Sequence, residues 1–250
     1  MPTDAIWYRD AYVRSVTSVA TRVEPVDERH GLIVLDQTVF YPGGGGQPSD
    51  QGELTAADGR RWDVRAARRV GDDIVHEVML EPDGSLPAVG TPLTAEVDWI
   101  RRHLLMRTHT ALHALCGVVW RDYRALVTGG NMEPGSGRMD FEFETLRAEL
   151  AATIEATVNT ELAQQRPVHV RFLTLEEAAA IQDLIRTRTD LLPTGISEVR
   201  VIDIEGLDMQ ADGGTHVANT REVGGIRITG TESKGRINKR IRMELVAPVA

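Results

Sequence analysis

Apolar and polar residues follow a strand-like pattern through the first 97 or so residues. They roughly alternate from Tyr12 to Val23, and short runs rich in β-branched and aromatic residues follow at Leu32–Phe40, Trp62–Val70, Ile74–Leu80 and Leu93–Val97. Turn-forming residues separate these runs at Pro42–Gly46, Asp58–Gly59, Gly71–Asp72 and Pro82–Gly84. Several short strands at this spacing predict a small barrel or sandwich.

The pattern changes at Asp98, a plausible helix N-cap. Helical spacing predicts one helix from Ile100 to Trp120 and a second from about Thr145 to Gln165. The second has an apolar ladder that steps by four residues: Leu146, Leu150, Ile154, Val158 and Leu162. Thr174 and Glu177 form a capping box that opens a third helix. Strand-like runs lie at 125–128, 138–143, 168–173, 199–204, 225–229 and 237–246. We therefore expect a β domain over residues 1–97 and a larger α+β domain over residues 98–250.

Composition narrows the class of protein. The chain of 250 residues is 42% hydrophobic and 26% charged, as in ordinary globular proteins. Its single cysteine, Cys116, excludes an internal disulfide and suits a reducing compartment. We see no signal peptide and no membrane span. The formal charge of -9 disfavours nucleic acid as a partner, but basic residues gather in Arg101–Arg107 and Lys234–Arg242.

Two short motifs carry candidate metal ligands. His109 and His113 are four residues apart on the first predicted helix, so their rings share one face. No Glu follows His109, which excludes the metalloprotease motif, and packing of both rings is the alternative. Asp212 and His216 flank Gly213 and Gly214, which allow a tight loop around one ion. A surface turn is the alternative for this second motif. Together the four side chains match tetrahedral zinc, one ion per chain.

The motifs RTHTALHAL (107–115) and DGGTHVANTREVG (212–224) resemble the editing domain shared by alanyl-tRNA synthetases and free-standing AlaX-type editing proteins. Threonyl-tRNA synthetases contain a related domain. FYPGGGGQPSDQG (40–52) and VDW (97–99) are similar to the same family, so the resemblance extends through nearly the whole chain. It implies an α+β fold, with a small translation-protein-like β-barrel before an α/β editing domain of antiparallel sheet and flanking helices. The length leads us to expect the medium-length class, which acts in trans and lacks an aminoacylation domain.

The chain departs from the family at Asp212, where relatives usually carry Cys. A carboxylate is a competent zinc ligand but harder than thiolate, so we expect weaker or more exchangeable zinc. Water in place of Asp212 is the alternative. The ion could activate water, polarise a carbonyl or position the substrate.

The resemblance implies hydrolysis of seryl-tRNA(Ala), and of glycyl-tRNA(Ala) as a second substrate, in the cytoplasm. It assigns catalytic or selective roles to Thr128, as the contact for the serine hydroxyl, and to Gln47. It assigns substrate contacts to Gly43, Gly44, Gly45, Thr108, Gly213, Gly214 and Thr215. For Thr128 and the glycine run, purely structural roles are the alternatives.

Lys234, Arg236, Lys239 and Arg240 are candidates for contacts with the tRNA backbone, and a solvated cationic strand is the alternative. The expected partner is mischarged tRNA(Ala), with neither DNA nor a membrane. Two other functions remain open: a metallo-esterase acting on small esters, and a non-catalytic tRNA-binding module.

Overall fold

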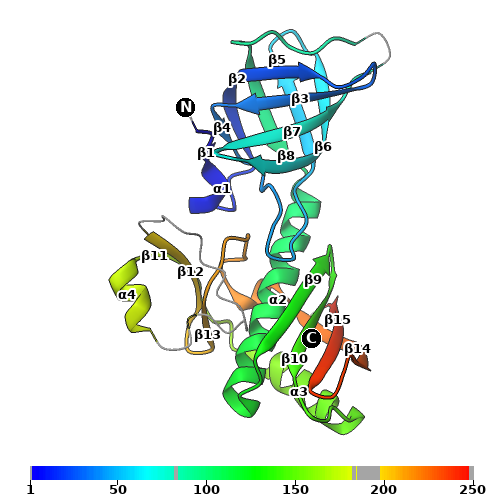
Figure 1. The fold of residues 1–250 in the computed structure, drawn as a ribbon, viewed down its shortest axis with the longest axis vertical. Coiled ribbons are helices and arrows are strands. Elements are labelled where there is room, and N and C mark those ends of the chain that lie inside the picture. Colours follow the sequence, from blue (N-terminus) through cyan, green and yellow to red (C-terminus); the bar gives the residue numbers. More distant parts are fainter. Residues whose placement is uncertain (1, 82–83, 182–183, 185–197, 248–250) are drawn as a thin grey trace. The chain divides into compact units, whose positions relative to one another are not determined.

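The computed structural model describes residues 2–81, 84–181, 184 and 198–247. The chain forms two compact units, Met1–His103 and Leu104–Ala250 (Figure 1). The long helix α2 (Trp99–Tyr123) supplies residues to both units. As predicted from the sequence, the fold class is α+β.

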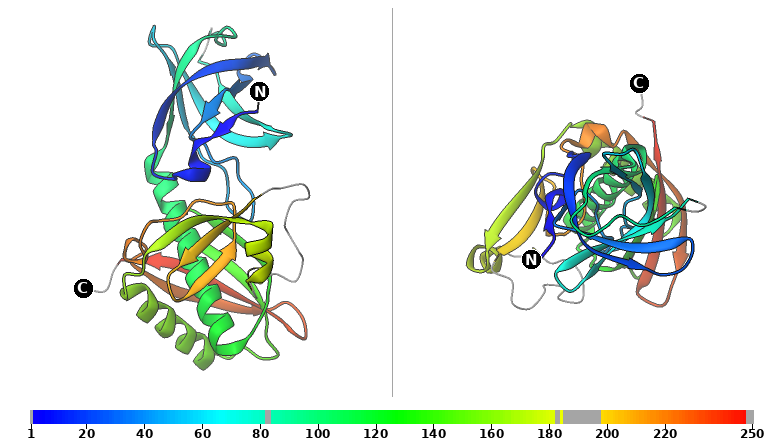
Figure 2. Two further views of the ribbon diagram at one scale, coloured as in Figure 1. Left: turned by 90° about the vertical axis from the view of Figure 1, so that its left-hand side faces the viewer. Right: turned by 90° about the horizontal axis from the view of Figure 1, so that it is seen from above.

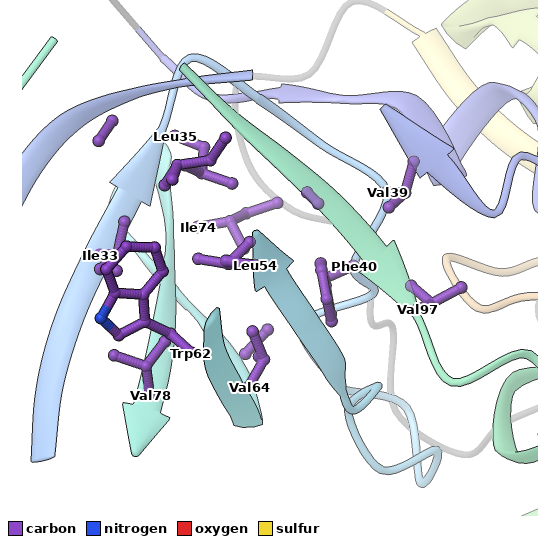
Figure 3. Packing of buried hydrophobic residues seen from close by; sticks show 14 of the residues in the cluster. Ile33, Leu35, Val39, Phe40, Leu54, Trp62, Val64, Ile74, Val78 and Val97 are labelled. Atoms are coloured by element: carbon purple, nitrogen blue, oxygen red, sulfur yellow. The ribbon is translucent and has the colours of Figure 1, made fainter. Parts of the chain in front are cut away.

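The first unit is built on a closed six-stranded barrel, with neighbouring strands in the order β2-β3-β7-β6-β5-β8. Its strands are β2 (Ser15–Pro25), β3 (His30–Leu35), β5 (Gly52–Ala56), β6 (Arg61–Val70), β7 (Asp73–Met79) and β8 (Pro92–Val97). In β8, buried and exposed residues alternate throughout, because successive side chains point to opposite faces of a strand. The inward residues form one apolar core, in which Phe40, Leu54 and Trp62 are prominent (Figure 3).

Sequence pattern located most of the barrel strands but missed three short elements and β5. The short elements are β1 (Asp4–Ala5), α1 (Ile6–Arg9) and β4 (Gln37–Thr38). Strand β5 contains only one β-branched residue, Thr55, so its composition gave no strand signal. Its pairing with β6 and β8 is what makes it a strand, and this pairing closes the barrel.

In the second unit, α2 lies between two antiparallel sheets (Figure 2). The four-stranded sheet has the order β14-β15-β10-β9 and the three-stranded sheet the order β11-β12-β13. Their strands are β9 (Val127–Glu133), β10 (Ser136–Glu142), β11 (Val168–Thr174), β12 (Glu198–Ile204), β13 (Asp208–Ala211), β14 (Gly225–Ser233) and β15 (Asn238–Val246). Close approaches between Gly137 and Leu112, and between Gly117 and Leu207, place one sheet on each side of the helix.

Helix α3 (Ala148–Ala163) protects the outer edge of β14. The Asn159 side chain donates to the Ile226 carbonyl (2.9 Å) and accepts from the Ile226 amide (2.8 Å). Glu155 accepts from the Ile228 amide (2.6 Å). These side chains bind backbone groups that an edge strand would otherwise leave unpaired.

Local signals fixed some helix ends better than others. Asp98 accepts from the Arg101 amide (3.1 Å), and the predicted Thr174–Glu177 capping box opens α4 (Leu175–Ala180), so both capping predictions are confirmed. The second helix, predicted from about Thr145 to Gln165, is observed as the shorter α3, which begins at Ala148 because its N-cap, Arg147, makes no side-chain cap. Among the described residues, no helix is both long and apolar enough to cross a bilayer.

Candidate metal centre

The two histidines of α2 and the histidine of the 212–224 motif meet in the interior of the second unit. The ring centroids of His109 and His113 lie 5.1 Å apart. The ring centroid of His216 lies 4.2 Å from that of His109 and 4.7 Å from that of His113. All three residues are buried. The i, i+4 spacing predicted a shared helix face, and the fold adds the third ring from a loop about a hundred residues further along the chain.

Asp212 completes the cluster. Its Oδ1 lies 3.6 Å from His109 Nε2 and 4.0 Å from His113 Nε2, while its Oδ2 lies 3.1 Å from His216 Nε2. One donor atom from each of the four residues lies within 4.8 Å of the others. Ligands of a tetrahedral zinc at roughly 2.1 Å from the ion are separated by about 3.4 Å. The donor set and its spacing therefore fit a divalent metal ion.

The protonation states suit a cation. Burial lowers the pKa of His109 and lowers that of His216 to about 4, which favours neutral imidazoles. Burial alone would raise the pKa of Asp212, but its interactions with the neighbouring imidazoles outweigh burial and hold it well below the usual value. Neutral rings and an ionised carboxylate are the forms that bind metal.

The loop after β13 places Asp212 by backbone contacts. The Gly214 amide donates to Asp212 Oδ2 (2.6 Å), and Arg200 Nη1 donates to the Asp212 carbonyl (2.7 Å). The expected tight loop is present, and it brings Asp212 Oδ2 within 3.1 Å of His216 Nε2 without a positive φ at Gly213 or Gly214. A turn in which the carboxylate accepts the amide two residues on shapes this loop instead.

Sequence reasoning missed three buried partners of the cluster. Thr110 Oγ1 lies 3.2 Å from His216 Nδ1, Asp208 Oδ2 lies 2.9 Å from His113 Nδ1, and Arg200 holds the Asp212 carbonyl. Thr110 stands between the two helix histidines, so its position was a usable signal. Asp208 and Arg200 belong to no motif, and only the pairing of β12 with β13 brings them to the site.

The hydroxyl groups of two residues predicted to contact substrate form hydrogen bonds within the protein. Thr108 is fully buried, donates to the Leu104 carbonyl (2.8 Å) and accepts from the Gly135 amide (3.0 Å). It thereby ties the β9–β10 turn to α2. Thr128 lies on β9 and donates to Asn238 Oδ1 (2.9 Å). Thr215 is buried. Contacts of these residues with a substrate stay predictions.

The glycine run belongs to the first unit and forms a tight reverse turn. Gly44 and Gln47 exchange two backbone hydrogen bonds (3.0 and 2.9 Å), and the intervening Gly45 and Gly46 have φ values of 56° and 87°. Positive φ at both central positions is the type I′ turn, which glycine adopts without strain. The Tyr41 hydroxyl donates to the Gly44 carbonyl (2.9 Å). The Gln47 side chain is buried, so this motif is an ordered turn rather than a loose linker.

The predicted tRNA-contact residues differ in their surroundings. Arg236 is exposed, and Lys234 lies beside Glu232 (3.3 Å). Arg240 is paired with Asp140 (2.7 Å). Lys239 is buried, with its ammonium donating to the carbonyls of Gly235 (2.7 Å) and Arg236 (2.9 Å). Lys239 therefore stabilises the β14–β15 turn, and contact of all four with RNA stays a prediction.

Comparison with known proteins supports one family throughout the chain. Residues 199–242 match the threonyl and alanyl tRNA synthetase second additional domain, and residues 6–101 match the class II (A) tRNA synthetases. The alanyl-tRNA editing protein AlaX-M of Methanosarcina barkeri is 34% identical over 245 residues, covering 98% of this chain and 99% of that protein. The AlaX-M protein of Saccharolobus solfataricus is 33% identical over 240 residues, covering 96% of this chain and 97% of that protein.

A longer relative contains the same region. The alanine–tRNA ligase of Pyrobaculum neutrophilum is 35% identical over 237 residues, which cover 92% of this chain but 25% of the ligase. The match to the AlaX-M proteins runs almost end to end in both partners, whereas only a quarter of the ligase is matched. The chain therefore belongs to the AlaX-M family of alanyl-tRNA editing proteins.

Proposed function

We propose that this protein acts in trans on tRNA(Ala), hydrolysing the ester bond that joins a wrong amino acid to the terminal adenosine. Serine is the proposed main substrate and glycine the second, and the cytoplasm is the proposed place of action. The observation that carries the proposal is the buried cluster of three histidines and one carboxylate, in a chain about one third identical to AlaX-M proteins over nearly its full length.

Zinc, held by His109, His113, Asp212 and His216, is the proposed cofactor. When bound, it would supply a Lewis acid that polarises the ester carbonyl or lowers the pKa of water. Burial favours neutral imidazoles at His109 and His216, and the carboxylate of Asp212 has a lowered pKa, which are the forms that bind a metal ion. Gly214 and Arg200 fix Asp212 through the loop backbone, while Thr110 lies against the outer nitrogen of His216.

Selection between serine and alanine requires a polar partner for a single hydroxyl. A site that binds this hydroxyl discriminates strongly against a substrate lacking it, because its own polar groups would be left unpaired. We assign this contact to Thr128. Its hydroxyl donates to Asn238 and keeps acceptor capacity for a substrate hydroxyl. Gly43, Gly44, Gly45 and Gln47, with Thr108, Gly213, Gly214 and Thr215, complete the proposed substrate-contact set.

A deacylation assay tests the function. Purified protein is mixed with seryl-, glycyl- and alanyl-tRNA(Ala), and release of each amino acid is followed beside metal analysis. We expect serine release far faster than alanine release, and loss of activity when a chelator removes the metal. No release by fully metallated protein would favour a binding module, while equal turnover of small aminoacyl esters would favour a general esterase.

Two variants test the assignment of Thr128. Thr128→Val removes the hydroxyl at nearly constant volume, and Thr128→Ser keeps the hydroxyl as the matched control. We expect Thr128→Val to lower the preference for serine over alanine by at least about tenfold, the value of one hydrogen bond to a buried hydroxyl. Thr128→Ser should retain the preference. Unchanged selectivity in Thr128→Val would refute the assignment.

A further inference from the structure

Asp208 opens strand β13 and is buried beside the metal cluster. Its side chain has no exposed surface, and its Oδ2 lies 2.9 Å from Nδ1 of His113. The side chain of Gln210, two residues along the same strand, donates to the same Oδ2 (2.8 Å) and lies 3.2 Å from Cys116 Sγ. The carboxylate is therefore held on one side by its own strand and bound on the other to a ring of α2.

This contact determines which nitrogen of His113 carries a proton. Asp208 Oδ2 accepts from Gln210, and the same oxygen can accept from a ring N–H, so Nδ1 of His113 is the protonated nitrogen. Nε2 then keeps its lone pair, and it lies 4.0 Å from Asp212 Oδ1, among the other donors of the cluster. A carboxylate or carbonyl on the outer nitrogen orients a ligating imidazole and raises its basicity.

A glycine in α2 allows the β12–β13 hairpin to bring Asp208 close to the helix. Asp208 reaches α2 at Gly117, one turn beyond His113. A Cβ at Gly117 would lie 2.9 Å from the Leu207 carbonyl oxygen and 3.0 Å from Asp208 Cβ. Any larger residue would push the β12–β13 hairpin away from the helix. A glycine inside a helix is unfavourable by about 1 kcal/mol, so a close backbone approach is a physical reason for its presence here.

From this geometry we propose that Asp208 is a positioning residue for the metal centre. It fixes the tautomer and the rotation of His113, and Gln210 fixes Asp208. The three histidines are then supported unequally, because the outer nitrogen of His216 lies against the Thr110 hydroxyl rather than a carboxylate. The inference rests on the metal site of the proposed function and extends it to residues outside the four ligands.

The first test measures metal affinity. Zinc dissociation constants of wild-type protein and Asp208→Asn are determined by competition with a chromophoric chelator. We expect zinc to bind Asp208→Asn about 10- to 100-fold more weakly, as for other partners of metal-bound histidine. Asp203→Asn is the matched control, since Asp203 lies on the neighbouring β12 and forms an ion pair with the exposed Arg171 (3.3 Å) rather than with the histidine cluster. Its zinc affinity should match that of wild type.

The second test reads the tautomer directly and needs no metal. Nitrogen NMR of metal-free protein labelled in histidine, assigned with a His113→Gln variant, should show the proton of His113 on Nδ1 in wild type. Asp208→Asn should lose this preference. If wild type bound no zinc, the proposed metal would fail, while the tautomer would still decide the role of Asp208.

A folded Asp208→Asn variant with unchanged zinc affinity and an unchanged tautomer would overturn the proposal. Should that variant fail to fold, Gln210→Leu removes only the anchor of the carboxylate. Zinc should then bind roughly 2- to 10-fold more weakly, the value of one hydrogen bond. Wild-type affinity in Gln210→Leu would likewise count against the proposal.

Discussion

The buried ion pair between Arg102 and Asp50 gives the sharpest prediction about stability. Arg102 has no exposed side-chain surface and Asp50 has 1%. The guanidinium donates to the carboxylate and to the carbonyls of Ala11 (2.8 Å) and Val39 (2.5 Å), while Asp50 also accepts from the Tyr41 amide (2.6 Å). This network ties the first turn of α2 to the segment that follows the glycine turn, within the first unit.

Asp50→Asn removes the negative charge and leaves a buried guanidinium with neutral acceptors only. Breaking one partner of a buried pair costs about 3–5 kcal/mol, because an uncompensated charge remains in a poorly solvated place. Since two backbone carbonyls still accept from Arg102, we expect the lower end, about 3 kcal/mol. Arg102→Met should cost a similar amount. The double variant carries neither charge, and its loss should be smaller than the sum of the two single losses.

Urea unfolding followed by tryptophan emission measures these free energies. In a Trp120→Phe background the remaining tryptophans are Trp7, Trp62 and Trp99, which belong to the first unit, so the emission follows the unit that contains the ion pair. A loss below about 1 kcal/mol for Asp50→Asn would contradict the buried-charge argument, which places single breaks of such pairs at 3–5 kcal/mol. Additive losses in the double variant would show that the two groups do not act as a pair.

Three further predictions concern other parts of the chain. Burial lowers the pKa of His76 to about 4, so the free energy of unfolding should fall as the pH drops from 6.5 towards 4, where only the unfolded state gains the proton. Between pH 7 and 4.5 the loss is about 2–3 kcal/mol, and unfolding titrations of His76→Gln should lack this loss. Asp212→Ala should weaken zinc binding by at least about 100-fold and Asp212→Cys should strengthen it, as thiolate is the softer ligand; chelator competition that finds no change would remove Asp212 from the ligand set. Asn159→Leu should cost about 2–4 kcal/mol in urea unfolding, because the buried amide and carbonyl of Ile226 lose their partner, whereas Thr160→Val at an exposed position of α3 should cost little.

Local signals were sufficient to predict several elements. The strand-forming run at Leu93–Val97, the apolar spacing along α2 and the capping box at Thr174 are local properties, so the sequence predicted these elements correctly. The elements that the sequence analysis missed or placed inexactly also have a physical explanation. Strand β5 lacks strand-forming composition, and the start of α3 carries no side-chain cap. In such places tertiary contacts, rather than local preference, determine the structure.

The sequence by itself determined the α+β class, the family and the four residues that gather at the metal centre, because two short motifs hold the ligands in pairs. Only the tertiary structure decided what surrounds them. Asp208 meets His113 across 95 residues of chain, and no local pattern encodes that distance. The same holds for Thr108 and Lys239, which the sequence analysis assigned to contacts with substrate and tRNA. In the fold, their side chains form hydrogen bonds with residues of the β9–β10 and β14–β15 turns. Hydrogen-bond partners of buried polar groups are set by chain packing, so they become visible only once the sheets close around α2.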